Sequence, residues 1–80
     1  MRAHQGQAGE AAALYREARS HAEALGLRPL VAQCQLGLGR LAEATGDAEA
    51  ARTELTRAAT TFRELGMPYW LAQVETALPR

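Results

Sequence analysis

The fold is decided by residues 29–65, PLVAQCQLGLGRLAEATGDAEAARTELTRAATTFREL, which read as two amphipathic helices joined by a tight turn. In the first half, apolar residues recur every three or four positions, at Leu30, Cys34, Leu38 and Leu41. In the second half the same spacing continues through Ala51, Leu55, Ala58, Phe62 and Leu65. At 3.6 residues per turn, each set forms an apolar stripe on one helix face. The two stripes predict an antiparallel helical hairpin.

The turn between the two helices has suitable residues. Gly46 can adopt the left-handed conformation that ends a helix, and the Asp47 carboxylate can accept the amides that begin the next one. Glycine followed by proline marks both other boundaries, at Gly26 with Pro29 and at Gly66 with Pro68. We therefore expect an all-α fold of four helices, at about residues 7–25, 29–44, 47–65 and 68–78.

The chain also repeats itself with a period of 40 residues. This shift pairs Gly6 with Gly46, Ala11 with Ala51, Ala18 with Ala58, Leu25-Gly26 with Leu65-Gly66, Ala32-Gln33 with Ala72-Gln73, Leu38 with Leu78 and Arg40 with Arg80. A fixed period of this size is typical of stacked helical hairpins, in which no unit covers its own apolar face. We predict a flexible lead-in at residues 1–6 and one module at residues 7–80, consisting of a half repeat, a full repeat and a half repeat.

The repeat unit resembles a tetratricopeptide repeat. Leu38-Gly39 matches the Leu-Gly pair of that family's first helix. The second-helix positions are matched by Ala51, Leu55 and Ala58, and in the preceding half repeat by Ala11, Tyr15 and Ala18. The resemblance implies a short solenoid of stacked antiparallel hairpins.

The unit also departs from the family pattern. Gln35 and Ala42 replace two first-helix aromatics, and the closing proline is displaced to Pro68. The spacing of about 40 residues overlaps that of HEAT and armadillo repeats, which are the rival class. The small residues Gly39, Ala51 and Ala58 stand where close helix crossing needs them, and they favour the tetratricopeptide-like fold.

Several stretches of residues 28–71 are similar to the C-terminal helical repeats of large bacterial signalling regulators with a cyclase or ATPase domain. They are Arg28–Leu30, Leu38–Leu41, Gly46-Asp47 and Phe62–Leu71. The similarity implies that the chain corresponds to the repeat tail of such a regulator, and not to its catalytic part.

Composition argues against several classes of partner. Nine basic residues balance nine acidic ones and are interspersed with them, so the basic patch needed for binding nucleic acid is missing. No apolar run approaches the ~20 residues that span a bilayer, and the chain begins with no signal sequence. We expect a cytoplasmic protein without membrane contact. Cys34 is the only cysteine, and its place on an apolar stripe predicts a small buried side chain.

No catalytic or metal-binding constellation stands out in the sequence. Gly37-Leu38-Gly39 follows no strand and lies inside a helical pattern, so close packing explains it better than phosphate binding. His21 has no Cys or carboxylate cluster at metal-ligand spacing, and Ser20, the only serine, has no catalytic partner. We therefore expect no enzyme activity, cofactor or metal.

The predicted partner-binding surface lies opposite the core stripe of the second helix and on the equivalent face of the fourth. It consists of Gln33, Leu36, Arg40, Glu43, Gln73, Thr76 and Arg80. The resemblance implies that this is a concave, peptide-binding side, and the alternative is an ordinary solvated face. A glutamine amide and an arginine suit the backbone and a carboxylate of an extended peptide, with Leu36 adding an apolar contact.

A second candidate surface lies at the end of the chain. Tyr69, Trp70 and Leu71 are a large apolar group for so short a last helix. They pack inward on Phe62 and Met67, or they bind another copy or a neighbouring domain. The expected function is a non-catalytic protein-interaction scaffold, and the alternative is a structural module that dimerises through its uncapped terminal helices.

Overall fold

The computed structural model describes the backbone of residues 2–78 and the side chains of residues 9–78. Over that range the chain forms four helices and no strand: α1 (Arg2–Ala24), α2 (Arg28–Ala44), α3 (Ala48–Glu64) and α4 (Pro68–Ala77). The predicted all-α fold is confirmed. The first helix begins at Arg2 and not near residue 7, so the backbone of residues 2–6 is helical where the sequence predicts a lead-in.

The three turns between helices share one design. Gly26, Gly46 and Gly66 have φ angles of 71°, 86° and 66°, in the left-handed region that favours glycine. In each turn the amide after the glycine donates to a carbonyl five residues earlier, as Asp47 N does to Ala42 O at 2.8 Å. This 6→1 hydrogen bond defines a Schellman turn. The glycine spacing of 20 residues therefore gives consecutive helices the same kind of connection.

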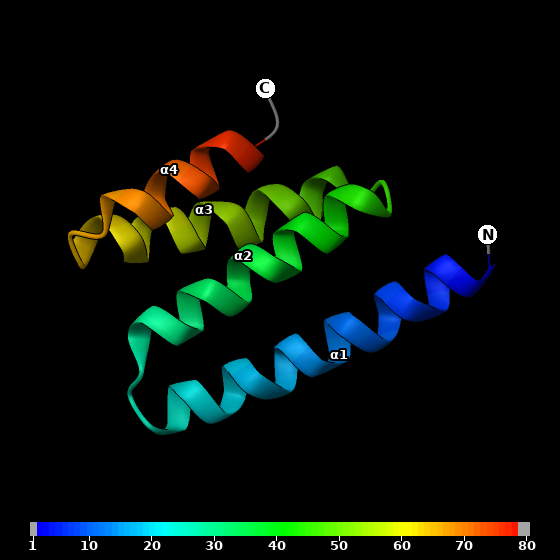
Figure 1. The fold of residues 1–80 in the computed structure, drawn as a ribbon, viewed down its shortest axis with the longest axis horizontal. Helices are drawn as coiled ribbons and strands as arrows, with labels where there is room; N and C mark the ends of the chain where they lie inside the picture. The colour runs from blue at the N-terminus through cyan, green and yellow to red at the C-terminus, as the bar shows by residue number, and fades with distance from the viewer. Residues whose placement is uncertain (1, 79–80) are drawn as a thin grey trace.

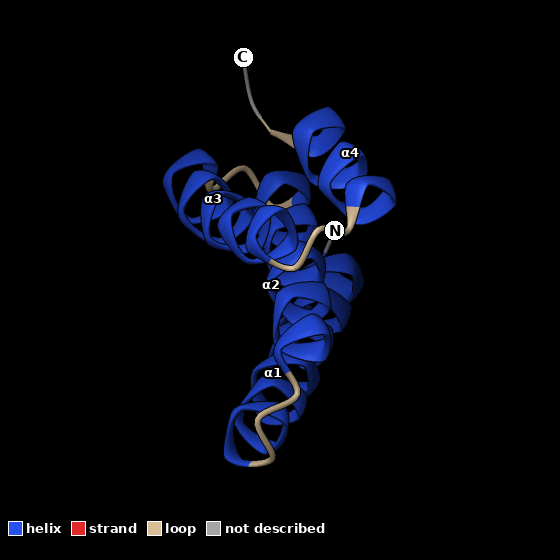
Figure 2. Ribbon diagram, turned by 90° about the vertical axis from the view of Figure 1, so that its left-hand side faces the viewer, coloured by secondary structure: helices blue, strands red, loops and turns tan. Residues whose placement is uncertain are grey.

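The helices stack in chain order (Figure 1). Each runs antiparallel to the one before it, and α2 contacts all three of the others. In the view that shows the helices nearly end-on, α3 and α4 lie on opposite sides above α2, while α1 continues below it (Figure 2). The order of contacts fits a helical repeat, in which each element packs mainly on its sequence neighbours.

The core lies between α2, α3 and α4. The predicted stripe of α3 is confirmed for Ala51, Leu55, Ala58 and Phe62, which are fully buried, while Leu65 at the C-cap is half-buried. The predicted stripe of α2 is only partly right. Cys34 and Leu38 are buried and Leu41 is half-buried, but Leu30 is 41% exposed. The remaining core residues of α2 and α4 are Ala32, Leu36 and Val74. Because α2 lies in the middle of the stack, it buries more than one face.

The apolar stripe of α1, which consists of Ala11, Tyr15, Ala18, Ala22 and Leu25, is the least covered of the stripes. Ala22 is buried, but Tyr15 is 38% exposed and Leu25 is 72% exposed. Leu14, which lies outside this stripe, is 66% exposed. Within residues 2–78, α1 packs along α2 alone, so one side of its apolar face has no helix over it.

The two glycines of α2 allow close helix crossing, as the sequence predicts. A Cβ on Gly39 would lie 2.5 Å from Leu55 Cγ, and one on Gly37 would meet the ring of Tyr15. Gly39 therefore brings α2 against α3, and Gly37 brings α2 against α1. The phosphate-loop alternative finds no support, because both glycines lie inside a helix.

Candidate protein-interaction groove

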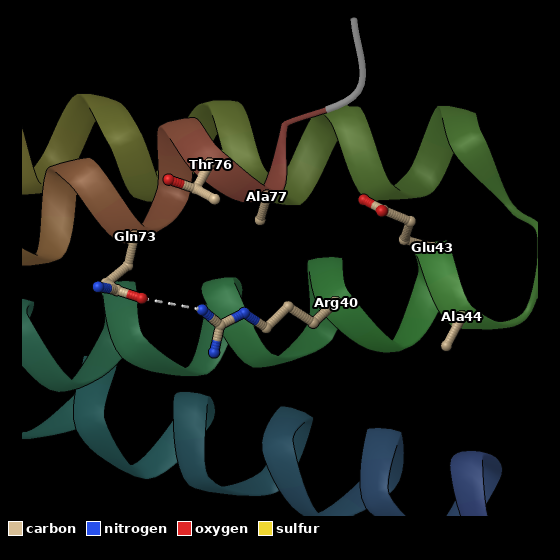
Figure 3. A pocket seen from close by; sticks show the side chains of 6 residues that line it. All are labelled: Arg40, Glu43, Ala44, Gln73, Thr76 and Ala77. Carbon is tan, nitrogen blue, oxygen red and sulfur yellow. Dashed lines mark hydrogen bonds between the residues drawn. The ribbon is translucent and has the colours of Figure 1, made fainter.

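A shallow pocket lies between α2 and α4 and has a volume of about 390 Å³. It is lined by Arg40, Glu43, Ala44, Gln73, Thr76 and Ala77 (Figure 3). Four of these six residues belong to the predicted partner-binding surface. The structure therefore places the polar residues of α2 beside those of α4, as expected for helices one repeat apart.

One hydrogen bond crosses this pocket. Arg40 donates from Nη2 to Gln73 Oε1 at 3.3 Å (Figure 3). Thr76 instead donates its hydroxyl to the carbonyl of Ala72 at 2.9 Å, within its own helix. The Arg40–Gln73 bond is exposed, and neither side chain belongs to the hydrophobic core.

A second pocket of about 360 Å³ adjoins the first, and both are lined by Arg40. Its other lining residues are Tyr15, Ala18, Leu30, Gln33, Cys34, Leu36, Gly37 and Trp70. We call the two pockets together the α2–α4 groove. It has a polar end at Gln73 and Thr76 and a mainly apolar end at Tyr15, Leu30 and Trp70. Gln33 lies at the apolar end.

The prediction for Leu36 is wrong. Its side chain is 3% exposed and packs in the core with the fully buried residues of α3. It reaches the floor of the apolar pocket but offers almost no surface to a partner. The reason is that α2 contacts helices on more than one side, so the face opposite its sequence stripe is also covered. Arg80, another predicted residue, lies outside the described residues.

The structure divides the Tyr69–Leu71 group. Tyr69 is 68% exposed, whereas Trp70 and Leu71 are half-buried and pack against the core. The Trp70 ring stacks on Phe62 with ring centroids 5.8 Å apart and an interplanar angle of 17°. Tyr69 meets the Trp70 ring edge-on at 5.5 Å. The expected inward packing thus holds for Trp70, and self-association through this group stays a prediction.

Arg40 differs from two other arginines in its surroundings. Arg19 of α1 bonds Glu54 of α3 at 3.2 Å, and Arg28 pairs with Glu64. The Arg19–Glu54 pair joins two helices that are not consecutive in the chain. Among the side chains of residues 9–78, no carboxylate lies within ion-pair distance of Arg40. Arg40 and Glu43 are the two charged residues that line the groove.

Sequence reasoning missed two features of the surface. Tyr15, Leu30 and Trp70 form the apolar end of the groove. The sequence pattern places Leu30 on a core stripe, Tyr15 at a position that matches the family's second helix, and Trp70 in a separate candidate surface at the end of the chain. The 40-residue shift pairs Leu30 with Trp70 and is the signal that could have placed them together. A larger pocket of about 520 Å³ lies between α1, α2 and α3, lined in part by Arg16, Leu38 and Asp47. Nothing in the sequence pattern singled it out.

Cys34 is buried, and burial raises the pKa of its thiol, while the nearby charge of Arg19 partly opposes this shift. The side chains of residues 9–78 contain no group of three potential metal ligands. None of the described helices is long and apolar enough to cross a membrane.

Comparison with known proteins identifies the repeat. The profile of the family described as "Tetratricopeptide repeat" matches residues 1–76. Searches of curated proteins and of solved structures each found no match. The profile match, the four stacked helices and the glycine at the α2–α3 crossing agree with one another. Repeats of this family are typically non-catalytic modules for protein–protein interaction. The chain belongs to the tetratricopeptide repeat family.

Proposed function

We propose that the chain is a scaffold that binds an extended peptide or an exposed segment of a partner protein in the α2–α4 groove. The observation that carries this proposal is the Arg40–Gln73 hydrogen bond, which joins α2 and α4 through two exposed polar side chains. In the absence of ligand these two side chains satisfy each other. A peptide would take over both, with its carboxylate on Arg40 and its backbone on the Gln73 amide.

The groove also suggests the order of side chains in the peptide. Its apolar end holds Tyr15, Leu30 and Trp70, and Arg40 lines the junction with the polar end. An extended chain advances about 3.3 Å per residue, so an apolar residue and an acidic residue a few positions apart would reach both ends. We therefore expect a ligand with one large apolar side chain and one nearby carboxylate.

The proposal extends to the setting of the module. The similarity of residues 28–71 to the repeat tails of bacterial cyclase- and ATPase-type regulators supports a role as the repeat tail of a cytoplasmic regulator. The module would then recruit a protein and would carry no enzyme activity of its own.

A phage-displayed peptide library tests this function. We expect peptides selected on the wild-type chain to carry an apolar and an acidic residue, and to shift the amide resonances of α2 and α4 in NMR spectra. Gln73→Ala should weaken their binding, whereas Arg52→Ala on the exposed surface of α3 serves as a matched control. Peptides that shift only α3 resonances would contradict the assignment of the groove.

A second candidate function, structural self-association, is favoured by the exposed apolar side chains near the two ends of the stack. Leu14 and Leu25 belong to the first half of the chain and Tyr69 to α4. These residues lie outside the lining of the α2–α4 groove, so association would leave peptide binding possible.

A further inference from the structure

The 40-residue repeat makes α1 the counterpart of α3, and α4 the counterpart of α2. In α3, Leu55 and Ala58 are fully buried, because α2 packs on one side of the helix and α4 on the other. Their counterparts in α1, Tyr15 and Ala18, stay partly exposed. Within residues 2–78, α1 has a following helix but no preceding one. The internal repeat thus indicates which helix would cover the open face of α1. It would be a helix that packs on α1 as α2 packs on α3.

The α2–α3 contact fixes the register of such a helix. Gly39 lies against Leu55, and at the other end of the pair Arg28 meets Glu64. Because the helices are antiparallel, each step back along α2 corresponds to a step forward along α3. Each α2 residue is replaced by its α4 counterpart, 40 positions later, and each α3 residue by its α1 counterpart, 40 positions earlier. This gives the register in which α4 would pack on α1. It places Tyr69 opposite Leu25, Ala72 opposite Ala22, Glu75 opposite Arg19, and Thr76 opposite Ala18.

The paired residues are complementary. Tyr69 and Leu25 are 68% and 72% exposed, so their contact would remove apolar surface on both sides from water. Glu75 is an exposed carboxylate opposite the guanidinium of Arg19. Arg19 already bonds Glu54 through Nη1, but a guanidinium has five N–H donors and can bond two carboxylates.

The remaining pairs are small. Ala72, Thr76, Ala18 and Ala22 have short side chains, and small residues at a helix crossing let the two backbones approach closely. The α4 surface is exposed at Ala72 and Thr76, and no described helix lies over it. Ala22 is already buried within its own chain, so the new contact depends on Ala18, Arg19 and Leu25 of α1 and on their partners in α4.

We propose that copies of this chain stack head to tail, with α4 of one copy packing on α1 of the next as α2 packs on α3. The contact joins two different surfaces, so it leaves one surface unused at each end and permits longer chains of copies. Since α4 has only ten residues, the interface is small, and we expect weak association that increases with concentration.

Two blocking variants test the proposal. Leu25→Asp disables the α1 surface and Tyr69→Asp disables the α4 surface, and both positions are exposed enough for the fold to survive. Analytical ultracentrifugation from micromolar to millimolar protein should show wild-type species that grow beyond the dimer. Each variant alone should raise the dissociation constant by about tenfold or more, because the new charge is placed in an apolar contact. Thr56→Asp, on the exposed side of α3, is the matched control.

The mixture of the two blocking variants is the decisive sample. It retains one intact α1 surface and one intact α4 surface, so head-to-tail stacking predicts a one-to-one dimer that grows no further. Glu75→Arg serves as a second α4 variant and should also weaken self-association. A wild-type chain that stays monomeric would overturn the proposal. So would a symmetric dimer that is lost in Leu25→Asp, kept in Tyr69→Asp and not restored by mixing. Ala18 and Thr76 belong to both the stacking surface and the groove, but Leu25 and Tyr69 line neither pocket of the groove. Neither result would therefore overturn the peptide-binding proposal, which the Arg40→Ala variant tests separately.

Discussion

Gly39 of α2 lies directly against Leu55 of α3. A Cβ atom at residue 39 would be 2.5 Å from Leu55 Cγ and 3.4 Å from the Ala51 carbonyl oxygen. Leu55 is fully buried beside Phe62, so it has little room to move away. The absence of a side chain at residue 39 therefore sets how closely the two helices of the full repeat approach.

The first prediction concerns this crossing. Gly39→Ala should destabilise the fold by about 1–3 kcal/mol through overpacking, even though alanine is the better helix former by about 1 kcal/mol. Gly39→Leu should destabilise the fold further, because its side chain is larger. Gly9→Ala is the control, because a Cβ there has no atom within 4 Å, and it should be neutral or stabilising. Urea denaturation monitored by circular dichroism measures each difference. An unchanged midpoint for Gly39→Leu would show that the helix crossing is misplaced.

Two ion pairs between helices differ in how deeply they are buried, and we expect them to differ in their contribution to stability. Arg19 and Glu54 are 22% and 20% exposed, while Arg28 and Glu64 are 54% and 56% exposed. We expect Glu54→Ala to cost about 1 kcal/mol, because it leaves the half-buried guanidinium with fewer partners. Glu64→Ala should cost less than about 0.5 kcal/mol. A double-mutant cycle for each pair provides the coupling energy, and a larger coupling for Arg28–Glu64 would contradict this order.

Helix capping provides a third prediction. Asp47 accepts a hydrogen bond from the amide of Ala50 at 3.1 Å, with φ −92° and ψ 81°. Leu27 occupies the same position before α2 with φ −89° and ψ 77° but has no cap bond. Asp47→Ala should therefore cost about 1 kcal/mol, and Leu27→Asp should gain a similar amount by capping the Leu30 amide. Thermal unfolding of both variants measures the effect. A less stable Leu27→Asp would mean that Leu27 packing contributes more than a cap.

Cys34 provides a pH-dependent prediction. Burial raises the pKa of its thiol, and Arg19 only partly offsets this effect. The folded chain therefore keeps the proton longer than the unfolded chain. Its contribution to stability is complete below the unfolded pKa of about 8.5 and is lost as pH rises through the folded value. Stability measured between pH 7 and pH 10 should fall more steeply in the wild type than in Cys34→Ala. A thiol that reacts with Ellman's reagent as fast as free cysteine would contradict the burial.

Much of the fold follows from local sequence chemistry. Gly26, Gly46 and Gly66 each need a positive φ, so their spacing alone locates the three turns. The stripe of α3 is predictable because its fully buried residues Ala51, Leu55, Ala58 and Phe62 recur every three or four positions. The burial of Leu36 could not be predicted from the sequence. Hydrophobic periodicity assumes that a helix buries one face, whereas α2 is covered on several.

The groove could be predicted in part. The 40-residue period makes Gln73 the counterpart of Gln33, which lies two turns before Arg40 on one face of α2. It therefore predicts that Gln73 and Arg40 belong to the same surface, and the structure shows a hydrogen bond between them. The same period pairs Leu30 with Trp70, but it does not predict the shape of the apolar end of the groove. This shape depends on how far Tyr15, Leu30 and Trp70 project from three different helices, and this is set by packing distances that no single stripe encodes.

The measurement that tests the central claim most directly is the affinity of a library-selected peptide for wild-type, Arg40→Ala and Arg52→Ala chains by isothermal titration calorimetry. If the α2–α4 groove is the binding site, Arg40→Ala should weaken binding by about tenfold to a hundredfold, because a charge-assisted hydrogen bond is lost, and Arg52→Ala should not change it. Equal affinities for all three chains would contradict the account.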